Sequence, residues 1–240
     1  MLSSVELPIA NLELSDRFDY DFVIASTCLE HYEYRQWYMD SDRFMILDNG
    51  AFEKGEAVND NEYLTLAHQL KPNVLVIPDV LDDVYATLQR YNGFMQLWKV
   101  NKIPDCKLMG VIQCSGNVAV AHMMGNTYYS NGIEWVGIPY YRSFMDRFSL
   151  IREHPEWSNV HILGLPILPE ALSLQTLPNV KSCDSSLPVK CALQGSRIEV
   201  ALHSSKYAKP DELHVDKDLL SHNLDMFKAV CDGTVRLTRL

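Results

Sequence analysis

The sequence has no hydrophobic run long enough to cross a membrane, and we expect no leader of the secretory type. A membrane-spanning helix needs about 20 apolar residues. A signal peptide begins with a basic segment that is followed by an apolar one. The chain starts Met1-Leu2-Ser3-Ser4-Val5-Glu6, which has neither feature. We therefore expect a cytoplasmic protein that does not bind membranes.

Paired cysteines and glycine-rich phosphate loops are also absent. The six cysteines stand apart without a CxxC pair, so we expect reduced and mostly buried thiols. No GxGxxG or Walker-type segment occurs, which argues against the common nucleotide-binding folds. The sequence predicts no cofactor and no metal site.

Basic residues are few, with 21 Lys and Arg against 31 Asp and Glu and a formal net charge of -10. This net negative charge argues against an extended basic surface that binds nucleic acid. It is compatible with a local rim of basic residues around a cleft. For any single basic residue, a solvated surface position is the more common role. The candidates for a rim are Arg142, Arg147, Lys190, Arg197, Lys206, Lys209, Arg236 and Arg239.

The chain does contain a regular alternation of apolar, β-branched runs and amphipathic segments. The predicted strands span 20–26, 43–48, 73–79, 107–113, 134–139, 160–165, 179–184 and 197–203. The predicted helices span 59–70, 82–100 (with a break near Asn92-Gly93), 117–129, 143–153, 168–176, 187–194 and 216–231.

This alternation predicts a parallel sheet with crossover helices. Eight such units in 240 residues match one α/β domain over 1–240, a compact (β/α)8 TIM-type barrel, which typically has about 250 residues. An open doubly wound sheet is the alternative. That fold usually carries a glycine-rich turn after its first strand, where this chain has Ala25-Ser26-Thr27-Cys28.

Three predicted strands end on an aspartate, namely Asp48, Asp79 and Asp184, and a fourth ends on Gln113. Active groups of barrels lie at the carboxyl ends of the strands, so these side chains are expected to line one mouth. The competing explanation is helix capping, which for a single aspartate is the more common role. Asp82 is the better cap candidate beside Asp79, which leaves Asp79 free to face the mouth.

Six segments, in order, resemble the tRNA-guanine transglycosylases. Asp48-Asn49-Gly50-Ala51-Phe52-Glu53 is similar to that family's Asp-Ser-Gly-Gly-Phe-Gln, and Pro78-Asp79 stands where the family has its guanine-recognition aspartate. Gly110-Val111-Ile112-Gln113 is similar to Gly-Ile-Val-Gln. Val136-Gly137-Ile138-Pro139 and Leu163-Gly164-Leu165-Pro166 stand at its glycine-rich strand ends, and Cys183-Asp184-Ser185-Ser186-Leu187-Pro188 resembles the segment that carries the nucleophile.

The chain departs from that family in its zinc motif, CxCxxC followed by His. It has only Cys183, Cys191, His203 and His214, at other spacings, and buried thiols with ordinary histidines are favoured over a metal site there. The chain is also shorter and carries Asp-Asn-Gly-Ala. In these respects it resembles the short, zinc-less, phage-type DNA guanine transglycosylases (DpdA-like), which place a 7-deazaguanine base into DNA. A phage-encoded member would act in the host cytoplasm.

The resemblance implies a role for each candidate site residue. Asp184 would be the nucleophile and Asp48 the general acid/base. Asp79 would accept hydrogen bonds from the guanine base, with Gln113 and the Gly137 N–H donating to its O6 side. The remaining implied substrate-binding residues are Asn49, Phe52, Gly164 and Tyr140, with Phe52, Tyr140 and Tyr141 as candidates for an aromatic wall or for plain packing.

The partners implied are a 7-deazaguanine such as preQ0 or preQ1 and a nucleic acid, with DNA favoured over tRNA. An enzyme with so few basic residues could dimerise or recruit an accessory protein to hold its polymer. Three alternatives stay open: the same exchange on tRNA, a nucleoside or glycoside hydrolase with the same two carboxylates, and a non-catalytic partner subunit.

Overall fold

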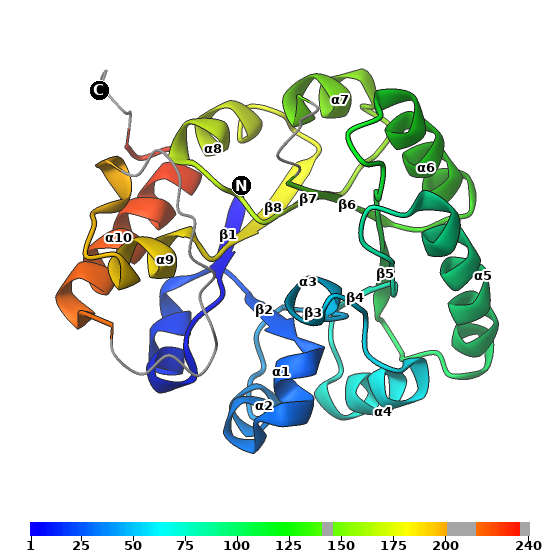
Figure 1. Ribbon diagram of the computed structural model, residues 1–240, viewed down its shortest axis with the longest axis horizontal. Helices are drawn as coiled ribbons and strands as arrows, with labels where there is room; N and C mark the ends of the chain where they lie inside the picture. The colour runs from blue at the N-terminus through cyan, green and yellow to red at the C-terminus, as the bar shows by residue number, and fades with distance from the viewer. Residues whose placement is uncertain (141–145, 201–214, 236–240) are drawn as a thin grey trace.

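The computed structural model describes residues 1–140, 146–200 and 215–235. Eight parallel strands surround one axis and helices cover their outer side (Figure 1), which confirms the predicted (β/α)8 TIM-type barrel. The strands are β1 (Leu2–Val5), β2 (Asp21–Ile24), β3 (Met45–Asp48), β4 (Val74–Val76), β5 (Lys107–Val111), β6 (Trp135–Pro139), β7 (Val160–Leu163) and β8 (Val180–Ser185).

The hydrogen-bonded order is β1-β8-β7-β6-β5-β4-β3-β2, and parallel ladders join every neighbouring pair in that order. β1 and β2, the two ends of the order, meet through single contacts. Ser4 Oγ accepts a hydrogen bond from Phe22 N at 3.2 Å, and Asp19 N donates to Ser3 O at 3.1 Å. The barrel is therefore nearly closed, with its weakest junction between β1 and β2.

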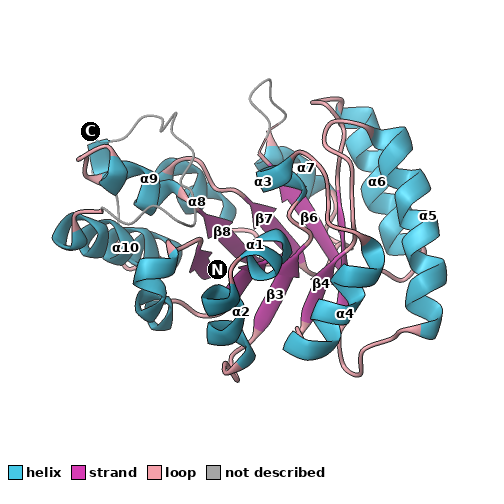
Figure 2. Cartoon of the chain, turned by 60° about the horizontal axis from the view of Figure 1, so that its bottom comes forward, coloured by secondary structure: helices cyan, strands magenta, loops and turns pink. Residues whose placement is uncertain are grey.

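The helical elements between and after the strands have these bounds: η1 (Ile9–Arg17), α1 (Ala25–Glu30), α2 (Tyr32–Met39), α3 (Ala51–Lys54), α4 (Asp60–Leu70), α5 (Val84–Val100), α6 (Val118–Ser130), α7 (Arg147–Glu153), α8 (Leu168–Leu174), α9 (Leu187–Leu193), η2 (Ile198–Val200) and α10 (Lys217–Cys231). Figure 2 shows α5 and α6 along one flank of the strands, with α9 and α10 at the opposite end. Over the described residues, no helix combines the length and the apolar character that crossing a membrane requires.

The predicted strand at 197–203 is wrong. Ile198–Val200 forms the short 3-10 turn η2, and the amide of Ile198 donates to Asn223 Oδ1 of α10 at 2.9 Å. Residues 201–203 lie outside the described part. The eighth strand is instead β1, which pairs with β8 from Leu2↔Ser182 to Val5↔Ser185. Its four residues include two serines, so it lacks the apolar run that reveals a strand in a sequence.

The predicted helices correspond to α4 through α10, with two corrections. α5 runs without a break through Gly93, contrary to the predicted interruption. Its N-cap is Asp83, whose side chain accepts from Ala86 N, and not Asp82, which has a left-handed φ of 55°. The helices α1 and α2 between the first two predicted strands were not expected. Residues 143–145 of the predicted helix 143–153 lie outside the described part.

The strands separate two apolar clusters, one inside the barrel and one between the strands and the helices. Alternate residues of a strand point to opposite faces. In β3, Ile46 belongs to the interior cluster and Leu47 to the outer one, so Asp48 returns to the interior side. In β8, Cys183 belongs to the outer cluster, which places Ser182 and Asp184 on the interior side. Asp48 and Asp184 therefore lie on the interior face of the barrel, near the carboxyl ends of β3 and β8.

Candidate functional site

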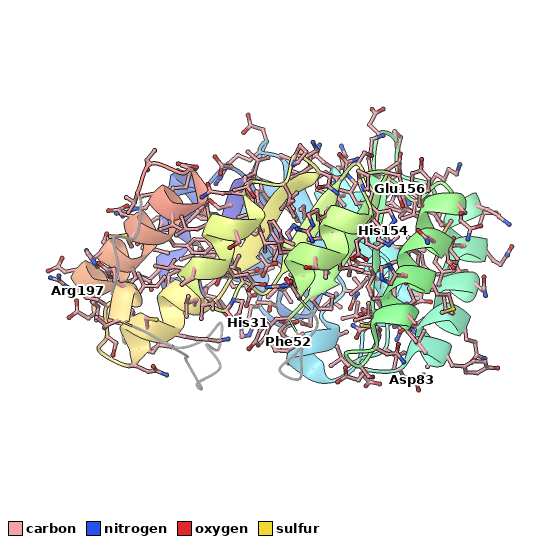
Figure 3. The ribbon with its side chains drawn as sticks, turned by 90° about the horizontal axis from the view of Figure 1, so that it is seen from above. His31, Phe52, Asp83, His154, Glu156 and Arg197 are labelled. Carbon is pink, nitrogen blue, oxygen red and sulfur yellow. The ribbon has the colours of Figure 1, made fainter. Side chains whose placement is uncertain are left out.

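The candidate site is the mouth at the carboxyl ends of the strands. Asp48 is the last residue of β3 and Asp184 the fifth residue of β8, while Asp79 and Gln113 follow β4 and β5. Asp79, Gln113 and Asp184 are buried and Asp48 is partly buried. Figure 3 shows Phe52 and Asp83, which follow β3 and β4, at one edge of the barrel and Glu156 at the opposite edge. The predicted strand-end groups therefore lie at one end of the barrel.

Asp184 is held by an imidazole and by the backbone. Oδ1 lies 3.0 Å from Nε2 of His161, and the amide of Gly164 donates to both carboxylate oxygens at 3.2 and 3.3 Å. The amide of Leu165 donates to the main-chain carbonyl of Asp184 at 2.9 Å. Asp184 is 2% exposed, and groups from β7 and from the two residues after it fix its carboxylate in one orientation.

His161 is a site residue that sequence reasoning missed. It is completely buried and stacks on Phe22 with ring centroids 5.5 Å apart and an interplanar angle of 9°. Its Nδ1 lies 2.8 Å from Ser182 Oγ. An ionised carboxylate can only accept hydrogen bonds. Nε2 of His161 therefore donates a hydrogen bond to an ionised Asp184, and Nδ1 then accepts a hydrogen bond from the Ser182 hydroxyl. The available signal was one polar residue inside the apolar run Val160-His161-Ile162.

Asp48 and Asn49 form a tight turn at the end of β3. Asp48 Oδ2 accepts from the amide of Gly50 at 2.8 Å. Gly50 has φ +76°, and a Cβ there would lie 2.6 Å from Ser26 Oγ. The turn therefore requires glycine, both for its left-handed backbone and for its close approach to α1.

Asn49 connects this turn to Asp79. Its Nδ2 donates to Asp79 Oδ1 at 2.7 Å and to the carbonyl of Ile77 at 3.2 Å. Its Oδ1 accepts from the amide of Ala51 at 2.9 Å. The side chain is 1% exposed, so it acts as a buried link between the ends of β3 and β4.

Asp79 is held from its other side by Gln113. Nε2 of Gln113 donates to Asp79 Oδ2 at 2.5 Å, and Oε1 of Gln113 accepts from the amide of Asp82 at 3.1 Å. Burial raises the pKa of Asp79, and the hydrogen bonds from Gln113 and Asn49 oppose that rise. Asp79 is not a helix cap, since Asp83 caps α5.

The mouth carries further acidic groups that shift the titration of Asp48. Burial is the largest cause that raises the pKa of Asp48 well above its ordinary value, followed by the charge of Glu53. Asp79 and Asp184 raise this pKa further, while the Gly50 amide opposes the rise. A carboxyl group in this position holds its proton at a higher pH than an exposed one.

Glu6, directly after β1, is a second group that sequence reasoning missed. Its amide donates to the carbonyl of Ser185 at 3.3 Å, which places it beside the end of β8. Burial and then the charges of Glu53 and Asp184 raise the pKa of Glu6 well above its ordinary value, and Lys190 opposes the rise. The sequence does not indicate this position, because the short strand β1 before Glu6 lacks the apolar run that reveals a strand.

The other predicted substrate-binding residues differ in how far they are exposed to solvent. Gly137 lies within β6, where a Cβ would meet Leu163 Cδ1 and Met109 Sδ at 3.0 Å, so it belongs to the barrel interior. Phe52 on α3 is 66% exposed and Tyr140 after β6 is 39% exposed. Gly164 contacts Asp184 directly, as described above. Tyr141 lies outside the described residues.

The predicted basic rim is only partly described. Arg147 belongs neither to a basic rim nor to the solvated surface. It is buried and forms a two-pronged ion pair with Glu170 at 2.7 and 2.8 Å. Its Nη1 also donates to the carbonyls of Ile138 and Leu163 at 3.1 and 3.0 Å. Lys190 is partly buried and Arg197 is exposed. The remaining candidates, Arg142, Lys206, Lys209, Arg236 and Arg239, lie outside the described residues.

The cysteines are free thiols, and five of the six are buried, with Cys106 partly exposed. Cys183 and Cys231 approach each other with 3.8 Å between their sulfurs. Within the described residues, no three His, Cys, Asp or Glu side chains are arranged to hold a metal ion together. His203 and His214 lie outside that part.

Comparison with known proteins adds no family to this picture. No family model matches the chain, and no curated protein matches it either. A function for the mouth is therefore inferred from its residues, their contacts and the six sequence segments.

Proposed function

We propose that the barrel mouth exchanges a guanine base in DNA for a 7-deazaguanine through a covalent glycosyl-aspartate intermediate. The observation that carries this proposal is the pair Asp48 and Asp184, which project from the interior faces of β3 and β8 into different surroundings. Two carboxyl groups in unlike environments can divide the roles of nucleophile and proton carrier between them. The six transglycosylase-like segments supply the substrate class.

In the proposed reaction, a carboxylate oxygen of Asp184 attacks C1′ of the target nucleotide. The C1′–N9 bond breaks, and its electron pair leaves with the guanine, which takes up a proton. The incoming 7-deazaguanine then attacks C1′, loses its N9 proton and releases Asp184. This is the double displacement of a retaining glycosidase applied to a nucleoside. The His161 and Gly164 contacts would keep the attacking oxygen in place.

Asp48 would carry the proton to and from the exchanging bases. Its raised pKa keeps the carboxyl group protonated nearer to neutral pH, which is the property that a general acid needs. The Gly50 amide fixes one of its oxygens. The charges that raise this pKa are those of the other mouth carboxylates, so the acidic cluster itself would support catalysis.

Asp79 would recognise the base. Guanine presents two adjacent donors, N1–H and the exocyclic amine, and a carboxylate offers two acceptors to them. Asn49 and Gln113 donate to different oxygens of Asp79, and a carboxylate oxygen can accept more than one hydrogen bond. A base must leave the helical stack to reach this depth, and Phe52 and Tyr140 could form the apolar wall that receives it.

DNA is preferred to tRNA as the polymer because the zinc-ligand spacing is missing and the turn reads Asp-Asn-Gly-Ala. The acidic mouth and the net charge of -10 limit contacts with phosphate, since such contacts depend on Lys and Arg. A second copy of the chain or an accessory protein could supply the missing cations.

The proposal is tested by supplying labelled preQ0 or preQ1 together with DNA or with tRNA. Label is expected in DNA, and the Asp184→Asn variant should incorporate at least about a thousandfold less, because the nucleophile is lost. Asp216→Asn is the matched control, since Asp216 caps α10 and asparagine caps equally well. Label in tRNA alone would contradict the DNA assignment, and full exchange by Asp184→Asn would contradict the mechanism. Guanine release without an incoming base would indicate a hydrolase.

A further inference from the structure

An exposed apolar patch lies beside the mouth, and two of its three side chains have no part in the proposed reaction. The patch consists of Leu29 near the end of α1, Tyr32 at the start of α2 and Phe52 on α3. Figure 1 shows α3 next to the strand ends, with α1 and α2 farther from the barrel axis. These three side chains form the rim patch, which extends outward from the mouth.

Contacts between α1 and α3 hold the rim patch together. Nζ of Lys54 on α3 lies 2.6 Å from Oε1 of Glu30 on α1. Figure 3 shows His31, the residue before Tyr32, at the same edge of the barrel as Phe52. The two aromatic side chains of the rim patch therefore stand on neighbouring segments at the mouth end of the barrel.

The Tyr32 ring is held in place although the residue is 66% exposed. Its hydroxyl donates to Oε1 of Gln36 at 3.2 Å, and the guanidinium carbon of Arg35 lies 5.6 Å from the ring centroid, within the range of a cation–π contact. A ring that is already ordered loses little conformational freedom when a flat ligand stacks on it. Arg35 also brings a positive charge to the surface on which such a ligand would lie.

A single-stranded nucleic acid fits these features. Its bases stack on aromatic side chains regardless of sequence, and an adjacent arginine strengthens the contact. A stable protein partner or a second copy of the chain needs far more surface than three side chains offer, since such interfaces bury about 800 Å² on each partner. Two aromatic rings instead suit about one or two bases.

The charges around the rim patch limit contacts with the phosphate backbone. Glu33 follows Tyr32 and is exposed, and the chain carries a net charge of -10. Lys54 is already paired with Glu30. Stacking must therefore supply most of the affinity. A single strand permits this, because its bases are unpaired and the target base leaves the stack at a lower cost than from a duplex.

We propose that the rim patch binds single-stranded DNA next to the target guanine, with the neighbouring base stacked on Tyr32 and its phosphate beside Arg35. This inference rests on the proposed base exchange and names the form of its polymer. Phe52 would stand between the stacked base and the guanine that enters the mouth. With only one or two phosphates neutralised, the binding constant should depend weakly on salt, with a log–log slope of about -0.7 to -1.4.

The test measures the binding of a fluorescent, guanine-containing oligodeoxynucleotide to the full-length chain by anisotropy. The same sequence as a duplex and a tRNA are the comparison ligands, and the parent protein should bind the single strand most tightly. Tyr32→Ala should weaken this binding about tenfold, a usual effect of losing one stacked base. Tyr32→Phe keeps the ring and should bind like the parent protein.

The matched control is Tyr129→Ala. Tyr129 is also an exposed tyrosine, but it lies near the end of α6, before β6 begins, and this variant should bind the single strand like the parent protein. Circular dichroism checks that each variant is folded. Equal binding by the parent protein and Tyr32→Ala would overturn the inference. So would tighter binding of the duplex or the tRNA, or no binding of the single strand by the parent protein.

Base exchange by the same variants separates this inference from the proposed function. Exchange into DNA with the same KM for DNA in the parent protein and Tyr32→Ala would overturn the role of the rim patch and leave the reaction standing. Binding of single-stranded DNA that depends on Tyr32, without any exchange by the parent protein, would support the rim patch and contradict the reaction.

Discussion

On the β3–β5 side of the mouth, side-chain amides hold Asp79, whereas on the β7–β8 side an imidazole and a backbone amide hold Asp184. Asn49 and Gln113 enclose Asp79, and all three follow strand ends in short loops. Asp184 instead depends on His161 of β7 and on Gly164 directly after it, about 20 residues earlier in the chain. Local turns build the first side, and the packing of neighbouring strands builds the second.

For the proposed reaction, the difference predicts which residues affect binding and which affect the covalent step. In the proposed reaction, the β3–β5 side recognises the base and carries protons, and the β7–β8 side forms the bond. Loss of the contacts that hold Asp79 on the first side should then raise the KM for the base, while loss of the proton carrier Asp48 or damage to the second side should lower kcat. Four substitutions test this separation, in order of decreasing effect.

His161→Ala should have the largest effect on stability, about 3–4 kcal/mol. It leaves a cavity inside the barrel and removes the hydrogen-bond partner of Ser182 and Asp184, two costs that add. Urea unfolding measures the loss, and kcat for base exchange should fall because Asp184 is no longer held. His68→Ala, on the exposed side of α4, is the control and should change little. A rise in KM with unchanged kcat would contradict the proposed division.

Asn49→Ala should cost about 2–3 kcal/mol, because Asp79, the Ile77 carbonyl and the Ala51 amide lose a buried partner. The KM for the incoming base should rise more than kcat falls. Chemical denaturation and steady-state kinetics measure the two effects. Asn92→Ala, on the exposed side of α5, serves as the control and should stay within about 0.5 kcal/mol of the parent protein. An unchanged KM would count against Asp79 as the base-binding group.

Gly50→Ala should destabilise the protein by about 2 kcal/mol, since alanine is strained at φ +76° and its Cβ would meet Ser26 Oγ. Combining it with Ser26→Ala removes the closest atom, Oγ, but leaves the Cβ of residue 26 at 2.8 Å and the backbone strain. The double variant should therefore recover only part of the loss, as a double-mutant cycle measured by thermal unfolding can show. Complete recovery would mean that the backbone conformation costs nothing.

Asp48→Asn should have the smallest effect on stability, and in the opposite direction. The folded pKa of Asp48 is raised, so the folded state binds its proton more tightly than the unfolded state, whose carboxyl pKa is about 3.9. Below that value the group costs no stability. As the pH rises from there through the folded pKa, the parent protein loses stability relative to the variant.

At pH 7 we therefore expect Asp48→Asn to be more stable than the parent protein, because asparagine has no charge to bury at this position. The gain should disappear near pH 3. Urea unfolding at both pH values measures it, and base exchange should fall about 100-fold or more with loss of the proton carrier. A gain that is the same at both pH values would contradict the pKa assignment.

The β3–β5 side could be predicted in much greater detail than the β7–β8 side. Asp48, Asn49, Asp79 and Gln113 follow strands with strong apolar runs, so strand ends and side chains were found together. His161 lies within a strand, and only its pairing with β8 brings it to Asp184. Glu6 was missed because β1 is short and contains two serines, whose burial comes from the neighbouring strands and not from their own hydrophobicity.

The sequence by itself determined the alternation of strands and helices, the barrel fold and the positions of the strand-end carboxylates, because apolar periodicity and chain length express these directly. Only the tertiary structure decided which segment supplies the eighth strand, which groups hold Asp184 and how the mouth carboxylates shift one another's pKa values. It also joined α1 to α3 at the rim of the mouth, through Glu30 and Lys54. These features depend on distances between residues far apart in the chain, and a local pattern carries no information about such distances.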